Sequence, residues 1–222
     1  MTTQLAELVH IPDGEAIIEG MLEVPDHAKG IVLFAHGSGS SRFSPRNNYV
    51  ADVLRKAGVA TLLMDLLTPE EDSDYQTRFD IPLLTRRLTV ATKWLKQDER
   101  CRTLAIGYFG ASTGAAAALQ AAAKMGDATA AVVSRGGRPD LAGGEALRKV
   151  TAPTLLLVGG WDDVVIELNQ AAYEVMNCTK KLSIISGATH LFEEPGTLEE
   201  VARQAAAWFT LYLDTSPTSP PH

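Results

Sequence analysis

GYFGASTGAAAA, residues 107–118, is the stretch of sequence that decides the fold. It begins as an apolar strand, ends in an alanine run that predicts a helix, and contains the G-x-S-x-G motif Gly110-Ala111-Ser112-Thr113-Gly114 between the two. A chain that turns this sharply leaves no room for side chains two residues before and after the serine, which explains Gly110 and Gly114. The motif therefore predicts a strained turn that presents the Ser112 hydroxyl above a sheet, at the N-terminus of a helix.

Short apolar runs alternate with helical patterns on both sides of this motif, which is typical of a mostly parallel sheet. The six core runs are Ile31–Ala35, Ala60–Met64, Leu104–Tyr108, Ala130–Val133, Thr154–Val158 and Leu182–Ile185. Two earlier runs, Leu5–Ile11 and Ile17–Val24, flank the turn-like Pro12-Asp13-Gly14 and predict an antiparallel hairpin at the sheet edge. We therefore expect an α/β fold of three layers, with an eight-stranded sheet, helices on both faces and no cap domain.

Apolar residues at helical spacing mark the helices between the strands. Ser44 and Pro45 predict a helix cap and a first helical residue, and Thr197 with Glu200 predicts a capping box for the last helix. The apolar faces are formed by Val50, Val53, Leu54 and Ala57; by Leu84, Leu88, Ala91 and Leu95; by Val165, Leu168, Ala172 and Met176; and by Leu198, Val201, Ala205, Trp208 and Tyr212. Residues 1–214 are expected to form one domain, and residues 215–222, with three prolines, a disordered tail.

Composition and charge exclude several classes of protein. The chain has 20 Lys and Arg against 27 Asp and Glu, a formal net charge of −7, which argues against nucleic-acid binding. Residues 1–10 lack the pattern of a signal peptide, and no run approaches the roughly 20 apolar residues that span a bilayer. Two distant cysteines without C-x-x-C spacing indicate a reducing compartment, so we expect a cytoplasmic protein. Neither H-E-x-x-H nor a Cys/His cluster is present, and no metal or cofactor is expected.

A serine nucleophile needs a base and an acid that orients the base, and in this type of fold they follow in the order Ser, Asp or Glu, His. Asp162 follows the strand Thr154–Val158 and is the expected acid, while His190 follows the last strand and is the expected base. An alternative interpretation is that Asp162 or, more readily, Asp163 caps the helix that begins near Val165.

The loop His36-Gly37-Ser38-Gly39 follows a core strand, where a second oxyanion donor is expected. We expect the backbone amide of Ser38 to pair with that of Thr113 in binding the oxyanion, Gly37 to contact substrate, and His36 to be a hydrogen-bonded structural histidine. Gly37 and Gly39 imitate a dinucleotide-binding fingerprint, but Arg42 stands at its third position, which argues against nucleotide binding.

Several other side chains have two interpretations each. Arg135 and Arg138, at the carboxyl end of a predicted strand, either bind a substrate carboxylate or bond to loop carbonyls and Asp140. Arg42 and Arg46 have the same two interpretations, as ligands of a substrate carboxylate or as ordinary loop arginines. Trp161 either lines the substrate pocket or packs in the core. Asp65, at a strand end, is either a rival for the role of the acid or, as we expect, organises the loop around it. Cys101 is not placed as a nucleophile.

FAHGSGSSRFSPRN, GYFGASTGAAAA, VVSRGGRPDL, LLLVGGWDDVVIELN and SGATHLFEEPG together resemble the α/β-hydrolase superfamily, and most of all its dienelactone hydrolase-like proteins. The resemblance covers residues 5–213 and implies an eight-stranded sheet with a triad of Ser112, Asp162 and His190. Dienelactone hydrolases proper use a cysteine nucleophile, whereas this chain carries serine.

The expected activity is hydrolysis of small or medium carboxylic esters through an acyl-enzyme. The connection between the strands ending near Ser134 and beginning near Thr154 is too short for a cap, so the pocket should be open to small-molecule esters. Two alternatives share every motif: an acyltransferase or peptidase with the same triad, and a non-catalytic scaffold. The sequence does not indicate the physiological ester or the oligomeric state.

Overall fold

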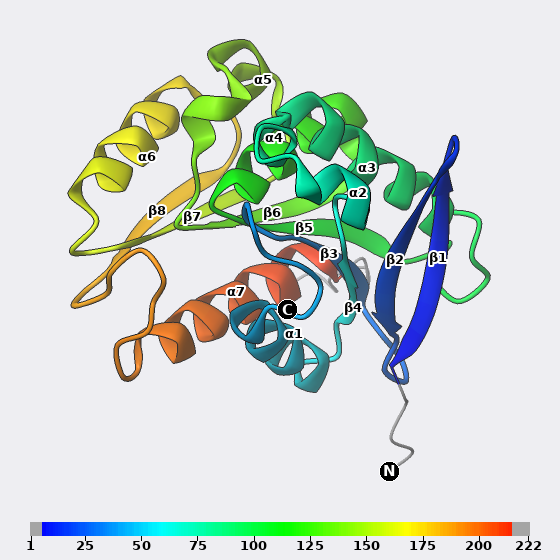
Figure 1. The fold of residues 1–222 in the computed structure, drawn as a ribbon. Helices are drawn as coiled ribbons and strands as arrows, with labels where there is room; N and C mark the ends of the chain where they lie inside the picture. Colours follow the sequence, from blue (N-terminus) through cyan, green and yellow to red (C-terminus); the bar gives the residue numbers. More distant parts are fainter. Residues whose placement is uncertain (1–5, 215–222) are drawn as a thin grey trace, which may run out of the picture.

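The computed structural model describes residues 6–214 of the chain. An eight-stranded sheet runs through its centre in the order β1-β2-β4-β3-β5-β6-β7-β8 (Figure 1). The strands are β1 (Glu7–Asp13), β2 (Ala16–Glu23), β3 (Gly30–Ala35), β4 (Ala60–Met64), β5 (Ala105–Ala111), β6 (Thr129–Arg135), β7 (Thr154–Gly159) and β8 (Lys180–Ile185). β2 runs antiparallel to β1 and β4, and all pairs from β4 to β8 are parallel. The predicted fold, a mostly parallel eight-stranded α/β sheet, is confirmed.

Helices cover both faces of this sheet (Figure 1). One face packs against α1 (Pro45–Lys56) and α7 (Thr197–Leu213), and the other against α3 (Ile81–Leu95), α4 (Thr113–Met125), α5 (Gly144–Lys149) and α6 (Asp163–Val175). The short α2 (Pro69–Ser73) and the 3-10 turns η1 (Thr77–Phe79), η2 (Gly126–Ala128) and η3 (Pro139–Ala142) lie in the connections. Each face has its own apolar core.

The central strands are apolar on both faces because both faces are covered. Every residue of β3, β4 and β7 is buried, as expected for parallel strands between two helical layers. In β1, by contrast, Val9 and Ile11 are buried while Leu8 is exposed, which is the alternation of a half-covered edge strand.

The edge hairpin turns two residues later than Pro12-Asp13-Gly14 predicted. Pro12 and Asp13 belong to β1, Asp13 pairs with Ala16, and the turn is Gly14 with Glu15, where Gly14 has a φ of 65°. Proline is tolerated at position 12 because β1 is an edge strand, in which the amides on the outer side have no neighbouring strand to bond. The expected first residue of this strand, Leu5, lies outside the described residues.

Helix starts were predicted with mixed success. Ser44 caps α1, and its hydroxyl accepts a hydrogen bond from the Asn47 amide. The capping box expected for α7 is wrong, because Gly196, with a φ of 81°, holds the cap position and Thr197 instead donates its hydroxyl hydrogen to a carbonyl one turn earlier. The Glu200 carboxylate binds Arg203 and Gln204 rather than the cap.

The buried face of α7 is also rotated slightly from the expected one. Phe209 and Leu213 are fully buried, whereas Trp208 and Tyr212 are half-buried at its border. Trp208 lies where its indole N–H donates to the carbonyl of Pro153, 3.2 Å away. An aromatic side chain with a polar tip is better placed at such a border than in the core.

The connection from β6 to β7 contains only η3 and α5. The structure therefore has no cap domain between β6 and β7 over the carboxyl ends of the strands. No helix within residues 6–214 has the length and apolar character that crossing a membrane would require. The tail predicted for residues 215–222 lies outside the described residues.

Candidate active site

Ser112 lies at the turn between β5 and α4, in backbone geometry that non-glycine residues rarely adopt. Its φ is 50° and its ψ is −120°. A Cβ atom on Gly110 would lie 2.4 Å from the Ala115 Cα, and one on Gly114 would lie 2.2 Å from the Ala35 carbonyl oxygen. Both glycines of the motif are thus required by close backbone approach, Gly110 to the new helix and Gly114 to the end of β3. The strain at Ser112 is of the kind that concentrates at functional sites.

Asp162 lies in the loop after β7, directly before α6. It occupies the cap position of that helix, but its side chain makes no capping hydrogen bond. Asp162 therefore holds the cap position without capping the helix through its side chain, and the interpretation of Asp163 as the cap is wrong, because Asp163 is the first helical residue. The Asp162 carboxylate instead faces the loop after β8, which carries His190.

Backbone contacts hold these two loops together. The Gly160 amide donates to the Ile185 carbonyl at 2.8 Å, and the Trp161 amide donates to the Ala188 carbonyl at 2.9 Å. A Cβ atom on Gly159 would lie 2.5 Å from that same Ala188 oxygen, so the loops approach this closely only because residue 159 is glycine. Position 159 fixes the separation of the two loops.

The histidine loop is also held from its far side. The Glu194 carboxylate accepts hydrogen bonds from the Thr189 amide at 3.0 Å and from the Thr189 hydroxyl at 2.5 Å. These bonds lower the pKa of the Glu194 carboxyl, because they stabilise its charged form. His190 follows directly after this anchored threonine.

Ser112, His190 and Asp162 form a hydrogen-bonded line. His190 Nδ1 lies 2.6 Å from Asp162 Oδ2, and His190 Nε2 lies 3.4 Å from Ser112 Oγ. When Nδ1 carries the proton and donates a hydrogen bond to the carboxylate, Nε2 is unprotonated and can accept a hydrogen bond from the serine hydroxyl. The imidazole is 38% exposed and the carboxylate 16%. A hydroxyl, an imidazole and a carboxylate in this order are suited to nucleophilic catalysis. A long distance between the serine oxygen and the histidine nitrogen, here 3.4 Å, is common in sites without substrate.

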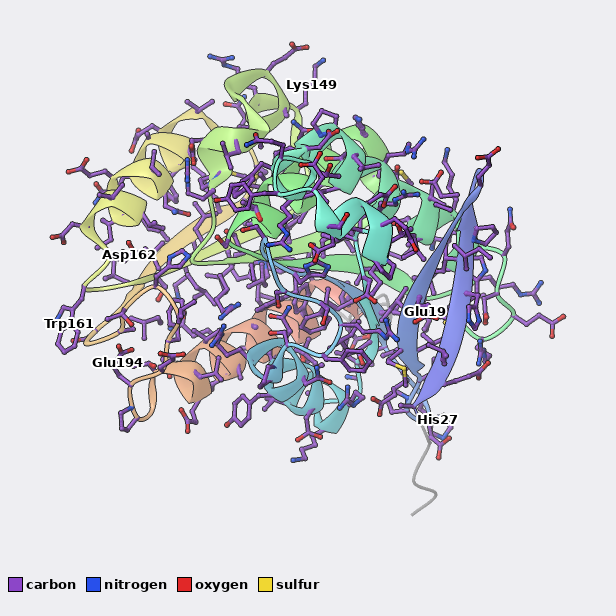
Figure 2. The ribbon with its side chains drawn as sticks, in the orientation of Figure 1. Glu19, His27, Lys149, Trp161, Asp162 and Glu194 are labelled. Atoms are coloured by element: carbon purple, nitrogen blue, oxygen red, sulfur yellow. The ribbon has the colours of Figure 1, made fainter. Side chains whose placement is uncertain are left out.

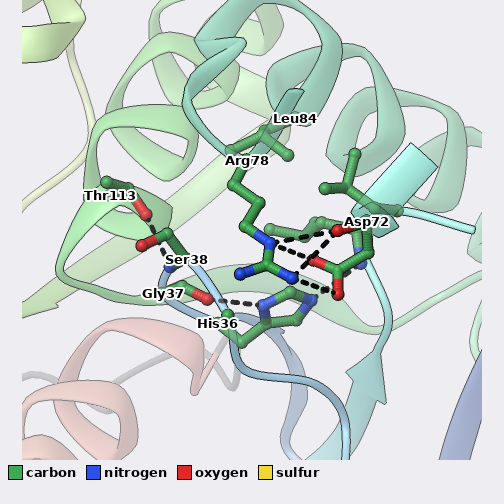
Figure 3. A pocket seen from close by; sticks show the side chains of 10 residues that line it. His36, Gly37, Ser38, Asp72, Arg78, Leu84 and Thr113 are labelled. Atoms are coloured by element: carbon green, nitrogen blue, oxygen red, sulfur yellow. Dashed lines mark hydrogen bonds and ion pairs between the residues drawn. The ribbon is translucent and has the colours of Figure 1, made fainter. Parts of the chain in front are cut away.

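The loop after β3 packs against the start of α4 (Figure 3). The Ser38 amide donates to the Thr113 hydroxyl at 2.9 Å, so the two residues expected to bind an oxyanion lie side by side, with the Ser38 amide already bonded. His36 is buried and bridges two segments: its Nε2 accepts the Leu66 amide hydrogen, which leaves Nδ1–H to donate to the Gly37 carbonyl, both at 2.9 Å. Burial lowers the pKa of His36, as expected for a neutral structural histidine.

A cavity of about 270 Å³ opens beside Ser112 and His190. Of the three residues expected to contact substrate, Gly37 and Arg135 line it, and a Cβ on Gly37 would lie 3.2 Å from that of Ser112. Trp161 does not belong to its lining, and it does not pack in the core either: it is 68% exposed and points outward from the loop that carries Asp162 (Figure 2).

The hydrogen-bond partners of Arg138, Arg42 and Asp65 indicate the roles of these three side chains. Arg138 binds Asp140 through two bonds of 2.9 and 2.7 Å, and Arg42 binds Asp65 through both its amide and its guanidinium. Asp65 therefore organises its loop, as predicted. Cys101 is buried, which raises the pKa of its thiol to about 11 and makes it a poor nucleophile.

Residues that the sequence did not single out also line the cavity or shape it. Asn47 and Leu191 belong to its lining, and Gly159 brings the acid and histidine loops together. Only Gly159 carried a signal, as the first of two glycines at a strand end. Among the residues that the structure describes, no group of three or more His, Cys, Asp or Glu side chains is arranged to hold a metal ion.

The chain is similar to known proteins both in sequence and in fold. The model of the family described as "Dienelactone hydrolase family" matches residues 18–214. The crystal structure of a dienelactone hydrolase from Anabaena variabilis is 56% identical, with a TM-score of 0.92 over 95% of this chain and 99% of that one. Est1E from Butyrivibrio proteoclasticus has a TM-score of 0.78 at 18% identity, over 92% of this chain and 98% of that one, and shares the fold.

Two curated proteins of Mycobacterium tuberculosis are 57% identical over 207 residues, and both are named "Putative phosphoribosyl transferase". The match covers 93% of this chain but 46% of each relative. The chain thus spans about half the length of these relatives.

Proposed function

Because the chain belongs to the dienelactone hydrolase family, we propose that it is a serine hydrolase that cleaves small or medium carboxylic esters. The single observation that carries this proposal is the hydrogen-bonded line from Ser112 through His190 to Asp162, which starts at a strained turn. The open cavity beside the serine supports a small-molecule substrate. The serine itself distinguishes this chain from family members that use cysteine.

In the proposed mechanism, the Ser112 oxygen attacks the ester carbonyl while its proton passes to His190 Nε2. The resulting imidazolium is stabilised by Asp162, which also keeps the proton on Nδ1 before the attack. Collapse of the tetrahedral intermediate expels the alcohol, which takes the proton from Nε2. Water then repeats the sequence on the acyl-enzyme, releasing the acid and regenerating the serine.

The negative oxygen of the tetrahedral intermediate needs donors next to Ser112. The Thr113 amide lies in the first turn of α4, where amides have no partner within the helix. The Ser38 amide is adjacent, and we propose that it exchanges the Thr113 hydroxyl for the oxyanion when substrate binds. Gly37 permits this approach because it presents no side chain toward Ser112.

The phosphoribosyl transferase name describes proteins of which this chain spans 46%. A serine, histidine and aspartate in line favour transfer of an acyl group to water, and they provide no evident means of activating a phosphoribosyl donor. We therefore propose hydrolysis for this segment, and an acyltransferase or peptidase with the same three residues is the alternative to be tested.

Fluorophosphonate labelling tests the proposal. The probe should form an adduct on Ser112, located by mass spectrometry, and Ser112→Ala should remove both the adduct and about a million-fold of the turnover of p-nitrophenyl esters. A folded protein in which Ser112 stays unlabelled would overturn the proposal in favour of a non-catalytic scaffold. A panel of p-nitrophenyl esters of increasing chain length, against matched anilides and acyl acceptors, separates an esterase from a peptidase or an acyltransferase.

A further inference from the structure

Arg135 ends the strand next to the nucleophile. It pairs with Ala111 across β5 and β6, and its carbonyl accepts the Ser112 amide hydrogen at 3.2 Å. Its side chain belongs to the lining of the cavity that also holds Ser112 and His190, yet the residue is only 7% exposed. A guanidinium is thus buried at the wall of the proposed substrate site.

The guanidinium of Arg135 lacks the partner that a buried charge requires. Its Nη2 donates one long bond of 3.5 Å to Asn47 Oδ1, and its Cζ lies 5.8 Å from the ring centre of Phe192. Its Nε and Nη1 are buried without any hydrogen-bond partner, and no carboxylate within residues 6–214 forms an ion pair with it. An unpaired buried charge is costly, so a structural role alone accounts poorly for it.

Other arginines of the chain differ in this respect. Arg42 binds two carboxylates, the nearly fully buried Arg87 also binds two, and Arg138 binds Asp140. Acidic partners are therefore supplied to arginines elsewhere, including buried ones. Arg135 is left without one at the place where substrate is expected.

A second arginine faces the same cavity. Arg46 lies in the first turn of α1, its Nη1 is 3.2 Å from the largely exposed Glu193 carboxylate, and its Nε is buried without a partner. Burial, and next the positive charge of Arg46, lower the pKa of Arg135 to about 10. The two guanidiniums are thus close enough to repel each other, which a bound anion would relieve.

The rest of the lining adds hydrogen-bond donors and no negative charge. Ser40, Ser44 and Asn47 line the cavity, the last two at the N-terminus of the twelve-residue helix α1, and no residue of the lining is Asp or Glu. The N-terminus of a helix favours anions because its free amides and its dipole are positive there. In a chain of net charge −7, this cavity is locally positive.

We propose that this cavity is an anion subsite, in which Arg135 and Arg46 hold an oxyanion group of the ester substrate beside Ser112. The inference rests on the proposed function and narrows its substrate class to esters that carry a second, acidic group. Two guanidiniums and a helix N-terminus match a dianion better than a single negative charge, so the favoured group is a phosphate monoester rather than a carboxylate. Arg135 is the principal ligand because no carboxylate of residues 6–214 pairs with it and its Nε and Nη1 have no hydrogen-bond partner.

A binding experiment tests the subsite without turnover. Inorganic phosphate is titrated into the Ser112→Ala variant and followed by calorimetry and by the rise in Tm, with sodium chloride at equal ionic strength as the reference. Arg135→Gln and Arg46→Gln, added separately, should weaken phosphate binding by about 10- to 100-fold. Arg138→Gln is the matched control, because its side chain pairs with Asp140 outside the cavity, and it should bind phosphate like the parent. Equal losses in all three variants, or no loss with Arg135→Gln, would overturn the proposal.

Stability separates a binding role from a structural one. Without phosphate, Arg135→Gln should fold with a Tm at or above that of the parent, because the substitution removes an unpaired buried charge. A large decrease in Tm would assign Arg135 to the structure instead and overturn its role as principal ligand. Arg46, with 31% of its side chain exposed, provides the binding comparison if Arg135→Gln does not fold.

Turnover gives the final comparison, in the otherwise unaltered enzyme. The ratio of kcat/KM for a phosphate-bearing p-nitrophenyl ester to that for a neutral ester of equal length should fall by about 10- to 100-fold in Arg135→Gln. An unchanged ratio would overturn the subsite, and faster turnover of a matched carboxylate-bearing ester would overturn the preference for phosphate. If the protein binds phosphate but Ser112 is never labelled, the proposed hydrolase function is overturned and the anion subsite is supported. If Ser112 is labelled but phosphate does not bind, the anion subsite is overturned and the hydrolase function is supported.

Discussion

Replacing Gly159 by alanine should separate the acid from the histidine without touching either side chain. The new Cβ would lie 2.5 Å from the Ala188 oxygen and 2.6 Å from the Thr189 oxygen, both in the loop that carries His190. These neighbours are backbone atoms, so they cannot turn aside as the end of a side chain can. The φ of Gly159 is outside the left-handed region, so alanine is acceptable to the backbone and only the contact changes.

The size of the effect follows from these distances. Ordinary van der Waals contact begins at 3.4 Å, so the two loops must separate by about 0.9 Å. The Asp162 to His190 hydrogen bond, now 2.6 Å long, spans the same gap and would be lengthened or broken. Misplacement of catalytic groups by about 1 Å costs on the order of 100-fold in rate, and overpacking of this kind costs about 1–3 kcal/mol of stability. We therefore expect kcat for p-nitrophenyl acetate to fall about 100-fold in a protein that still folds.

Gly144→Ala is the matched control. Gly144 opens α5, and the nearest atom to its added Cβ is a flexible Arg148 nitrogen at 3.6 Å, so both activity and Tm should be preserved. Steady-state hydrolysis, the rate of fluorophosphonate labelling and thermal unfolding are measured on both variants. A folded Gly159→Ala protein with the kcat of the parent would refute the argument that this glycine sets the distance between acid and base.

Three further predictions follow from other contacts. Asp162→Asn should lower kcat by about 10⁴-fold while Tm changes little, because the amide no longer selects the useful tautomer of the imidazole. Ester hydrolysis and thermal unfolding measure the two effects, and a loss of kcat below tenfold would contradict this role of Asp162. Burial holds the pKa of His36 below its ordinary value of 6.5, so the histidine of the unfolded chain binds a proton at a higher pH than that of the folded protein. The free energy of unfolding should therefore fall as pH is lowered through 6.5, with a slope of up to about 1.4 kcal/mol per pH unit. Denaturant unfolding at pH 5 to 7.5 should show this slope reduced in His36→Gln and kept in His10→Gln, an exposed control; identical slopes in both would exclude His36 as the cause. The pKa of Cys101 is raised to about 11, so iodoacetamide at pH 8 should modify it only after unfolding, and rapid alkylation of the native protein, detected by peptide mass mapping, would contradict its burial.

Features that depend on neighbours along the chain could be predicted from the sequence. The apolar runs identified all eight strands, and the glycines around Ser112 identified the turn, because both effects act within a few residues. The order of serine, acid and histidine could also be read, since each follows a strand and parallel strands end at the same edge of the sheet. The structure places the three side chains within hydrogen-bond distance there.

Features that depend on competition between partners were harder to predict. The motif Thr197 to Glu200 has the pattern of a capping box, but Gly196 takes the cap position and Arg203 takes the carboxylate. A genuine capping box forms instead at Thr68 with Glu71, which have the same spacing in the sequence. In both cases the local pattern is the same, and the surrounding residues decide which one forms.

The arginines show most clearly where prediction from sequence ends. Arg42, Arg135 and Arg138 all lie in or beside loops at the same edge of the sheet, and each was a reasonable ligand for a substrate anion. Their roles differ because their carboxylate partners differ: Arg42 binds Asp65 from the end of β4, Arg138 binds Asp140 two residues away, and Arg135 pairs with no carboxylate of residues 6–214. An unsatisfied charge is a property of the folded surroundings, so no window of sequence around residue 135 contains it. The same reasoning explains why Trp161, adjacent to the acid in sequence, turns away from the cavity while Asn47, 115 positions before Asp162, lines it. The framework of this site could therefore be predicted from the sequence, whereas the proposed selectivity for an anionic substrate depends on contacts that only the fold creates.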